Sequence, residues 1–169
     1  MDQKAPEIIF TLLIGIGIIA VLAVLKFSNA QFRREFRSSA MLLASLVAVG
    51  ATLGSLYFSE IREFLPCEWC WYQRIAMYPL AVLLPMATFR RDRRIIPYAL
   101  VLSLAGAGLS IYHYQLQAFP SQGSSCSLNA SCTYRWIEVF GFVSIPMLAL
   151  GSFVLISILL LSTPRPWKG

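Results

Sequence analysis

The sequence predicts an all-α integral membrane protein, built as a four-helix transmembrane bundle with one additional N-terminal transmembrane helix. The first observation is composition: the 169-residue chain is 57% hydrophobic and 13% charged, and its mean hydropathy is +0.67. A soluble domain of this size could not bury so much apolar surface, whereas a bilayer accommodates it. The second observation is a series of charge-poor runs, each close to the ~20 residues that a spanning helix needs.

The charge-poor runs number five, and we interpret each as a transmembrane helix. The first resembles the apolar part of a signal peptide. However, it lacks a basic n-region and a small-residue cleavage site, and Lys26 follows it directly. We therefore divide the chain into an N-terminal segment, residues 1–37, and a bundle domain, residues 38–169. The predicted spans are residues 8–25, 38–59, 70–89, 95–114 and 139–163.

Three prolines fall inside predicted spans, where we expect them to kink the helices. They are Pro79, Pro85 and Pro146. Neighbouring helices in a bundle can satisfy the backbone groups that such kinks release.

Positive charge alternates along the chain between successive connecting segments. Residues 26–37 and 90–94 each carry a net charge of +3 and residues 164–169 carry +2, whereas the other segments carry between −2 and 0. Basic loops remain on the cytoplasmic side, so the N-terminus is predicted outside and the C-terminus inside. A nucleic-acid-binding surface would explain the charge but not its alternation, so we expect contact with lipid and no nucleic-acid partner.

The four cysteines all lie in the two segments predicted to be outside. Cys67 and Cys70 form a C-x-x-C motif before the third predicted span, and Cys126 and Cys132 lie in the loop before the last. Three interpretations compete: two structural disulfides, a tetrahedral zinc site, and thiol–disulfide exchange.

The spacing of the cysteines favours redox exchange and leaves structural disulfides open. A disulfide across two intervening residues closes too short a loop to constrain the unfolded chain strongly. The spacing of the second pair does not suit a compact zinc knuckle, and the outside compartment oxidises thiols. We therefore expect no bound metal.

Polar residues inside the predicted spans are the next candidates. Arg74 follows Cys70 by four residues, which places both on one helix face, and an arginine near hydrocarbon indicates a function. The alternative is that its side chain extends to the lipid head groups. His113 is the only histidine and is predicted at the depth of the C-x-x-C motif, where it could donate protons near neutral pH. Gln73 and Tyr72 are weaker candidates.

Three segments of the chain resemble a known family. Residues 66–79 read PCEWCWYQRIAMYP, residues 132–146 read CTYRWIEVFGFVSIP, and residues 113–117 read HYQLQ. They are similar to the signatures of the DsbB family of disulfide-generating membrane proteins, and specifically of its shorter BdbC-like branch. The resemblance covers about residues 41–162 and implies a four-helix transmembrane bundle in a bacterial inner (plasma) membrane.

The resemblance also implies roles for the candidate residues. Cys126 and Cys132 would exchange with a DsbA-like thioredoxin-fold thiol oxidase, whose thiol would attack Cys126. Electrons would then pass to Cys67 and Cys70, and Cys70 would contact a membrane quinone, either ubiquinone or menaquinone. The residues expected to line the quinone site are Arg74, His113 and, at a position where some members have an acid, Gln73.

Some features depart from that pattern or leave alternatives open. The first predicted helix, residues 8–25, has no counterpart in a four-helix core and no assigned role. The loop cysteines are separated by only five residues, which argues against a large rearrangement between loops. The vitamin K epoxide reductase type has the loop pair before the C-x-x-C motif, the reverse of the order here. The remaining alternatives are a membrane scaffold with two structural disulfides and a zinc-bound adaptor.

Overall fold

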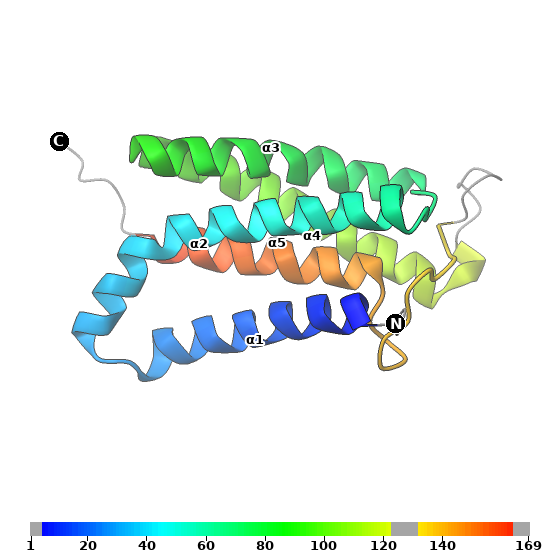
Figure 1. Cartoon of the computed structure of the whole chain (residues 1–169), viewed down its shortest axis with the longest axis horizontal. Helices are drawn as coiled ribbons and strands as arrows, with labels where there is room; N and C mark the ends of the chain where they lie inside the picture. Colours follow the sequence, from blue (N-terminus) through cyan, green and yellow to red (C-terminus); the bar gives the residue numbers. More distant parts are fainter. Residues whose placement is uncertain (1–4, 123–131, 164–169) are drawn as a thin grey trace.

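The computed structural model describes residues 5–122 and 132–163, and this part of the chain folds into five long α-helices without a β-sheet (Figure 1). Short π- and 3₁₀-helical turns extend or connect some of them. The prediction of an all-α fold is confirmed. The helices are α1 (Ala5–Phe27), α2 (Ala30–Leu56), α3 (Glu68–Arg90), α4 (Ile96–Ala118) and α5 (Ile145–Ser162).

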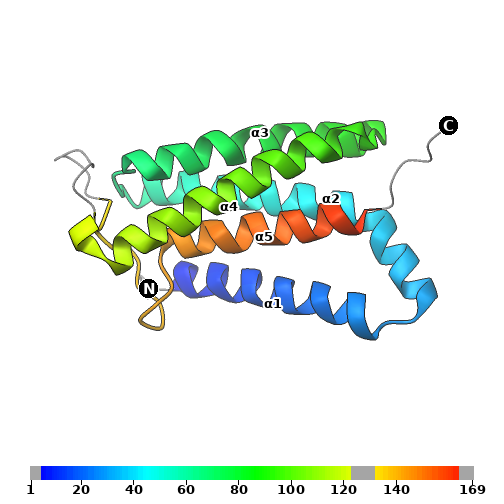
Figure 2. The ribbon, with the colours of Figure 1, turned by 180° about the vertical axis from the view of Figure 1, so that it is seen from behind.

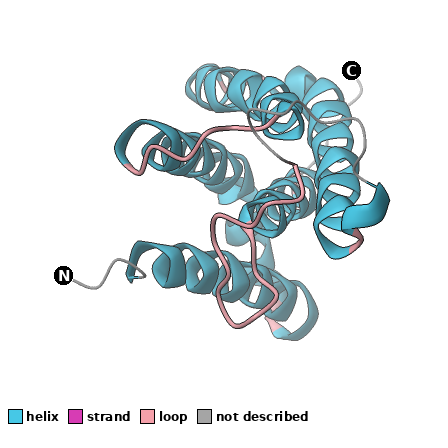
Figure 3. Ribbon diagram, turned by 90° about the vertical axis from the view of Figure 1, so that its right-hand side faces the viewer, coloured by secondary structure: helices cyan, strands magenta, loops and turns pink. Residues whose placement is uncertain are grey.

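Four of the helices form a bundle and the fifth lies beside it. Helix α2 packs against α3 and α5, and α4 packs against the same two helices from the other side. Helix α1 packs mainly against α5, on the outside of the bundle (Figures 1 and 2). Figure 3 views the helices from the end where the connections before α3 and α5 lie next to each other. This arrangement matches the predicted bundle with an additional N-terminal helix.

The bundle core combines large apolar side chains with small residues that allow close helix approach. Leu80 and Leu84 of α3 and Phe153 of α5 are fully buried. Phe153 packs over Gly106 of α4, where an added Cβ would lie 2.3 Å from the Phe153 ring. The Ser103 hydroxyl of α4 donates a hydrogen bond of 2.8 Å to the Phe153 carbonyl oxygen, which joins α4 to α5 through a paired polar group in the core.

Within the described residues, four helical segments are long and apolar enough to cross a membrane. They lie at Pro6–Val24, Ala30–Ile61, Arg93–Ala118 and Ile145–Ser162. Helix α3 is not among them, because it carries charged and polar residues such as Arg74 and Gln73. Its outward residues are nevertheless apolar and exposed, as in Ile75 and Val82. That α3 also crosses the bilayer therefore stays a prediction.

Two boundaries differ from the sequence prediction. Helix α2 begins at Ala30, so much of the predicted loop 26–37 is helical. The run 139–163 begins with a tight turn in which Val139 pairs with Val143, and Gly141 adopts a φ of +79°. A residue with positive φ cannot be part of a regular α-helix, and α5 starts after this turn, at Ile145.

One expected helix kink is wrong. Pro146 occupies the first turn of α5, where its missing N–H has no helical partner to lose and its ring fits the backbone. Pro79 and Pro85 do lie inside a helix, α3.

Candidate redox site

The C-x-x-C motif forms the beginning of α3. Cys67 is the N-cap residue of the helix, and its sulfur accepts a hydrogen bond from the Cys70 backbone N–H at 3.4 Å. Both cysteines are free thiols, and their Sγ atoms lie 3.1 Å apart. A thiolate at this position is stabilised by the positive end of the helix dipole. The pair is thus close enough to form a disulfide when it is oxidised.

His113 of α4 contacts the first cysteine of the pair. Its Nε2 atom lies 3.5 Å from Cys67 Sγ, and the residue is 1% exposed. Its Nδ1 atom has no hydrogen-bond partner among the residues that the structure describes. The predicted common depth of His113 and the C-x-x-C motif is therefore found. The imidazole lies against the thiol pair and does not line the larger pocket described below.

The surroundings of Cys67 strongly favour its thiolate. The pKa of Cys67 is lowered from the ordinary value of 9.0 to about 4, first by the hydrogen bond from the Cys70 thiol and then by His113. Burial acts in the opposite direction, and the two hydrogen-bonding neighbours outweigh it. Cys67 is thus the residue of the pair that carries negative charge in the reduced protein.

Arg74 lies one turn further along α3 and is anchored to α2. Its Nε atom donates a hydrogen bond of 2.9 Å to Ser55 Oγ, and its Nη2 atom donates one of 3.1 Å to the Ser55 carbonyl oxygen. The guanidinium carbon also lies 5.1 Å from the centre of the Trp71 ring. Arg74 is 8% exposed, so its head group points into the protein and the head-group alternative does not describe this structure.

Ser55 stands where α2 passes into a single π-helical turn, Tyr57–Ile61. Such turns frequently occur at functional sites, because they alter the direction in which backbone groups point. The Ser55 carbonyl oxygen accepts hydrogen bonds from both Arg74 and Ser59. This irregular end of α2 thus holds the arginine head group at the edge of a cavity.

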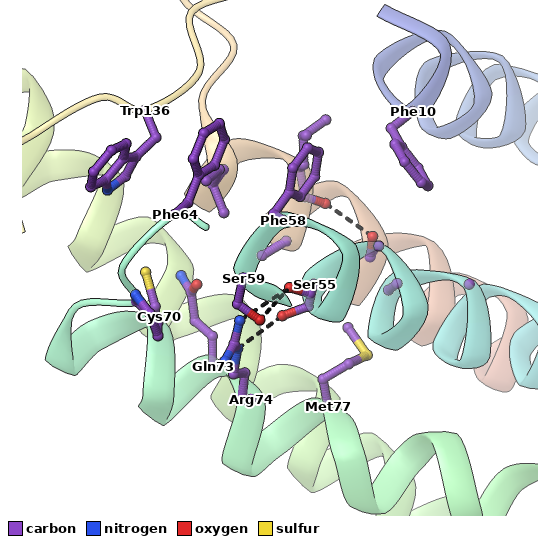
Figure 4. Close-up of a pocket in the computed structure, with 18 of the residues that line it drawn as sticks. Phe10, Ser55, Phe58, Ser59, Phe64, Cys70, Gln73, Arg74, Met77 and Trp136 are labelled. Atoms are coloured by element: carbon purple, nitrogen blue, oxygen red, sulfur yellow. Dashed lines mark hydrogen bonds between the residues drawn. The ribbon is translucent and has the colours of Figure 1, made fainter. Parts of the chain in front are cut away.

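The cavity has a volume of about 110 Å³ and lies among α1, α2, α3 and α5 (Figure 4). Its lining is mostly apolar, and α3 contributes the polar side. Cys70, Gln73, Arg74 and Tyr78 of α3 all line it. Neither Gln73 Nε2 nor the Tyr78 hydroxyl has a hydrogen-bond partner among the described residues. The pocket therefore offers unused polar atoms beside a thiol.

A group of three stacked aromatic rings lines one end of the same cavity. The ring of Phe64 stacks on Phe58 at 6.0 Å and on Trp136 at 5.2 Å between centroids. All three residues line the cavity, and Figure 4 shows them in a row above Cys70 and Gln73. These three rings thus form the aromatic side of the cavity that contains Cys70 and Gln73.

The segment before α5 brings Cys132 into the cluster that contains Cys67. Cys132 is 1% exposed and disulfide-bonded, and it packs in one cluster with Cys67 and Leu116. The segment is held to α4 by the Gln117 side chain, whose Nε2 donates to the Tyr134 carbonyl oxygen at 3.2 Å. Cys126 lies outside the described residues. The two motifs, which are far apart along the chain, thus meet at Cys67 and Cys132.

Sequence reasoning missed several residues of this site. Tyr78 follows Arg74 by four residues, so helical spacing from Cys70 could have found it. No sequence signal distinguishes Ser55 from the other serines of its helix, or Phe64 and Trp136 from ordinary interfacial aromatics. The weaker candidate Tyr72 lies outside the pocket, where its hydroxyl donates to Glu68 Oε1 at 2.8 Å.

Three potential metal ligands also gather here. The ligand atoms of Cys67, Cys70 and His113 all lie within 4.8 Å of one another. Structural zinc sites are closed by four protein ligands, so this group would leave one position open. The three residues therefore provide one ligand fewer than a structural zinc site needs, whereas the two thiols are sufficient for disulfide chemistry.

Comparison with known proteins identifies the family. The model of the family described as "Disulfide bond formation protein DsbB" matches residues 37–163. The chain belongs to the DsbB family. Among curated DsbB-family relatives, disulfide bond formation protein C of Bacillus subtilis is 51% identical over 115 residues, which cover 67% of this chain and 83% of the relative.

Two further relatives extend the comparison. A probable disulfide formation protein C of Bacillus cereus is 46% identical over 129 residues, covering 75% of this chain and 92% of the relative. A probable disulfide formation protein of Deinococcus radiodurans is 44% identical over 140 residues, covering 76% of this chain and 90% of the relative. No solved structure matches the chain. The DsbB family and its BdbC-like branch are thus confirmed, and the chain is a membrane thiol oxidoreductase of disulfide bond formation.

Proposed function

We propose that this protein reoxidises an extracytoplasmic DsbA-like thioredoxin-fold dithiol and passes the electrons to a membrane quinone. The electrons would move first to the Cys126–Cys132 disulfide and then to Cys67 and Cys70. One observation carries the proposal: the free thiol of Cys70 lines an apolar cavity together with Arg74 and with groups of Gln73 and Tyr78 that have no hydrogen-bond partner within the described part of the chain.

The lining of the cavity suits a quinone in its chemistry. The cavity volume of about 110 Å³ approaches the roughly 150 Å³ of an apolar protein cavity that admits a benzene ring, so a substituted quinone ring would need the cavity to widen. A quinone ring is apolar on its faces and accepts hydrogen bonds at its two carbonyl oxygens. Buried quinone oxygens need hydrogen-bond donors. The cavity offers three: the Gln73 Nε2 group, the Tyr78 hydroxyl and the Arg74 guanidinium.

The reaction balances as two disulfide exchanges followed by one reduction. The partner's two thiols become a disulfide while the loop disulfide becomes two thiols. The loop thiols would then reduce the Cys67–Cys70 disulfide through a mixed disulfide, and the presence of Cys132 and Cys67 in one buried cluster favours these two sulfurs for that bond. A bound quinone supplies an acceptor for the resulting two electrons and two protons.

The neighbouring residues have separate roles in this scheme. His113, beside Cys67 Sγ, stabilises the thiolate and exchanges the thiol proton. Arg74, held by Ser55, presents a fixed positive charge where negative charge develops on the ring oxygen. Cys67 would thus take part in exchange with the loop cysteines, and Cys70, which lines the pocket, would take part in quinone reduction.

The proposal includes an orientation in the bacterial plasma membrane. The N-terminus and both cysteine segments would face outward, and the basic segments 26–37 and 90–94 would face the cytoplasm. The thioredoxin-fold partner would then meet the loop cysteines in the oxidising compartment.

The experiment is quinone reduction by the purified protein, supplied with a reduced thioredoxin-fold oxidase and either ubiquinone or menaquinone. Wild type should turn over with at least one quinone, and Cys70→Ser should abolish turnover. Tyr72→Phe is the matched control, because this neighbour on α3 lies outside the pocket and should retain wild-type activity. Absence of turnover with both quinones, with all four cysteines oxidised, would instead indicate a scaffold with structural disulfides.

A further inference from the structure

Helix α1 lies outside the part of the chain that defines the family. The family match begins at residue 37, after α1 has ended at Phe27. One face of α1 is nevertheless directed at the bundle. Glu7 and Val21 are buried, and Phe10, Ile14 and Ile18 between them are partly buried, at the spacing of one helix face. The opposite face, including Leu13, is exposed and apolar.

Two side chains of the inward face line the large cavity. They are Phe10 and Ile14. The Phe10 ring lies 5.9 Å from Phe58, which belongs to the aromatic group at the outer end of the cavity. Figure 4 shows Phe10 across the cavity from the labelled residues of α3. Helix α1 is therefore one wall of the cavity that we assign to the quinone.

Glycines on the bundle allow this wall to approach closely. An added Cβ at Gly151 of α5 would lie 2.6 Å from Ile14 Cγ2, and one at Gly54 of α2 would lie 3.3 Å from the Phe10 ring. Because Ile14 is branched at Cβ, it has little freedom to move away from such a contact. Ile14 is thus seated in a gap that the glycine at position 151 leaves open, and Phe10 packs closely against Gly54.

An ion pair fixes α1 at the outer end of the cavity. Glu7 is 6% exposed, and its Oε1 lies 3.6 Å from Arg62 Nη2 in the segment that follows α2. The Arg62 guanidinium in turn lies 5.4 Å from the centre of the Phe64 ring, which lines the cavity. Helix α1 is therefore connected to the aromatic group as well as to α5.

We propose that α1 supplies the surface that receives the isoprenoid tail of the quinone, through Phe10 and Ile14. This inference rests on the proposed function and deepens it. The lining donors that have no partner among the described residues, Gln73 Nε2 and the Tyr78 hydroxyl, belong to α3, whereas Phe10 and Ile14 of α1 contribute only carbon atoms on the opposite side. A hydrocarbon tail leaving the ring away from α3 meets these two side chains. Helix α1 thereby determines which tails the enzyme accepts.

The test compares two quinones that differ only in the tail: one carries several isoprene units, and the other has a methyl group in their place. In full-length Phe10→Ala and Ile14→Ala, the KM for the isoprenoid quinone should rise by roughly tenfold, the size expected when a few apolar contacts are lost from a pocket. The KM for the tail-less quinone, the kcat and the rate of exchange with the reduced partner should not change. Leu13→Ala, on the exposed face of α1, is the matched control.

Several outcomes would overturn the inference. An unchanged KM for the isoprenoid quinone in both variants would show that the tail does not contact α1. Equal increases for both quinones, or the same increase in Leu13→Ala, would show that α1 only supports the bundle. If Phe10→Ala does not fold, Phe10→Leu should give a smaller increase with the same selectivity for the tail. A wild type that reduces neither quinone would contradict the proposed function itself, which is a different result.

Discussion

At the scale of single residues, the thiolate of Cys67 is the most specific electrostatic feature. Its pKa of about 4 depends first on Cys70 and then on His113. We expect acid titration of the reduced protein, followed by the ultraviolet absorbance of the thiolate, to show a midpoint near pH 4. In His113→Ala the midpoint should move up toward 9.0, whereas Ile111→Ala, on the exposed face of α4, should leave it unchanged.

The same depressed pKa links stability to pH. The unfolded chain holds a proton on this thiol up to about pH 9, whereas the folded chain releases it near pH 4. The stabilisation is therefore fully present above the unfolded value and is lost as the pH falls through the folded one. The reduced protein should gain stability as the pH rises from 4 to 9, and Cys67→Ser should lose that dependence. If the stability difference between wild type and Cys67→Ser did not change with pH, the low pKa of Cys67 would be contradicted.

The second prediction at this scale concerns Arg74. Hydrogen bonds to charged groups contribute roughly 1.5–3 kcal/mol, so Arg74→Met should lower kcat/KM for the quinone by roughly ten- to a hundredfold. The rate of exchange with the reduced partner should stay the same, because the guanidinium faces the cavity. Ser55→Ala, which removes only one of the anchoring groups, should give a smaller loss. Equal loss of both half-reactions in Arg74→Met would assign the residue a structural role instead.

The sequence indicates the candidate reactive residues of the site more clearly than the residues that support them. Cysteine, arginine and histidine are rare in apolar segments, so Cys70, Arg74 and His113 are conspicuous in the sequence itself. Ser55 and Tyr78 are ordinary residues of a helix, and only the fold brings them to the cavity. The contact of His113 with Cys67 likewise depends on the packing of α4 on α3, which no spacing along the chain specifies.

At the scale of helices, the close contact between α4 and α5 depends on Gly106. A Cβ at this position would lie 2.3 Å from the ring of Phe153, a fully buried side chain that cannot turn away. Gly106→Ala should therefore destabilise the protein by about 1–3 kcal/mol, the usual cost of overpacking a core. Gly108→Ala is the matched control, because an added Cβ there meets nothing within 4 Å.

Thermal unfolding in detergent measures this difference directly. The midpoint should fall in Gly106→Ala and stay the same or rise in Gly108→Ala, since alanine favours helix over glycine. A fall of the same size in both variants would mean that helix propensity, and not contact with Phe153, determines the result.

The sequence allowed us to predict that the helices exist, but not the residues at which they begin and end. Charge-free runs anticipate α1, α2, α4 and α5, because each lipid-facing helix needs apolar length. The prediction of one helix over 139–163 was wrong at its start, since hydrophobicity alone does not distinguish the apolar turn around Gly141 from a helix. Helix α3 was anticipated only by treating Arg74 as a functional exception within an apolar run.

At the scale of the whole molecule, charge distribution predicts orientation. Single cysteines should be introduced at Leu65 and at Arg91 of a cysteine-free variant, since both residues are exposed and lie at opposite ends of α3. A membrane-impermeant thiol reagent added to intact cells should label position 65 and not position 91. After the cells are broken open, both should react. Labelling of position 91 alone in intact cells would reverse the proposed orientation.

The central claim is that Cys67 and Cys70 deliver two electrons to a quinone held beside Cys70. The most direct measurement is a single anaerobic turnover of the reduced Cys126→Ser/Cys132→Ser variant, which keeps only this pair. The account predicts quinol in an amount equal to the protein, together with loss of both thiols and formation of the Cys67–Cys70 disulfide. Thiols that stay reduced in the presence of excess quinone, with no quinol formed, would contradict it.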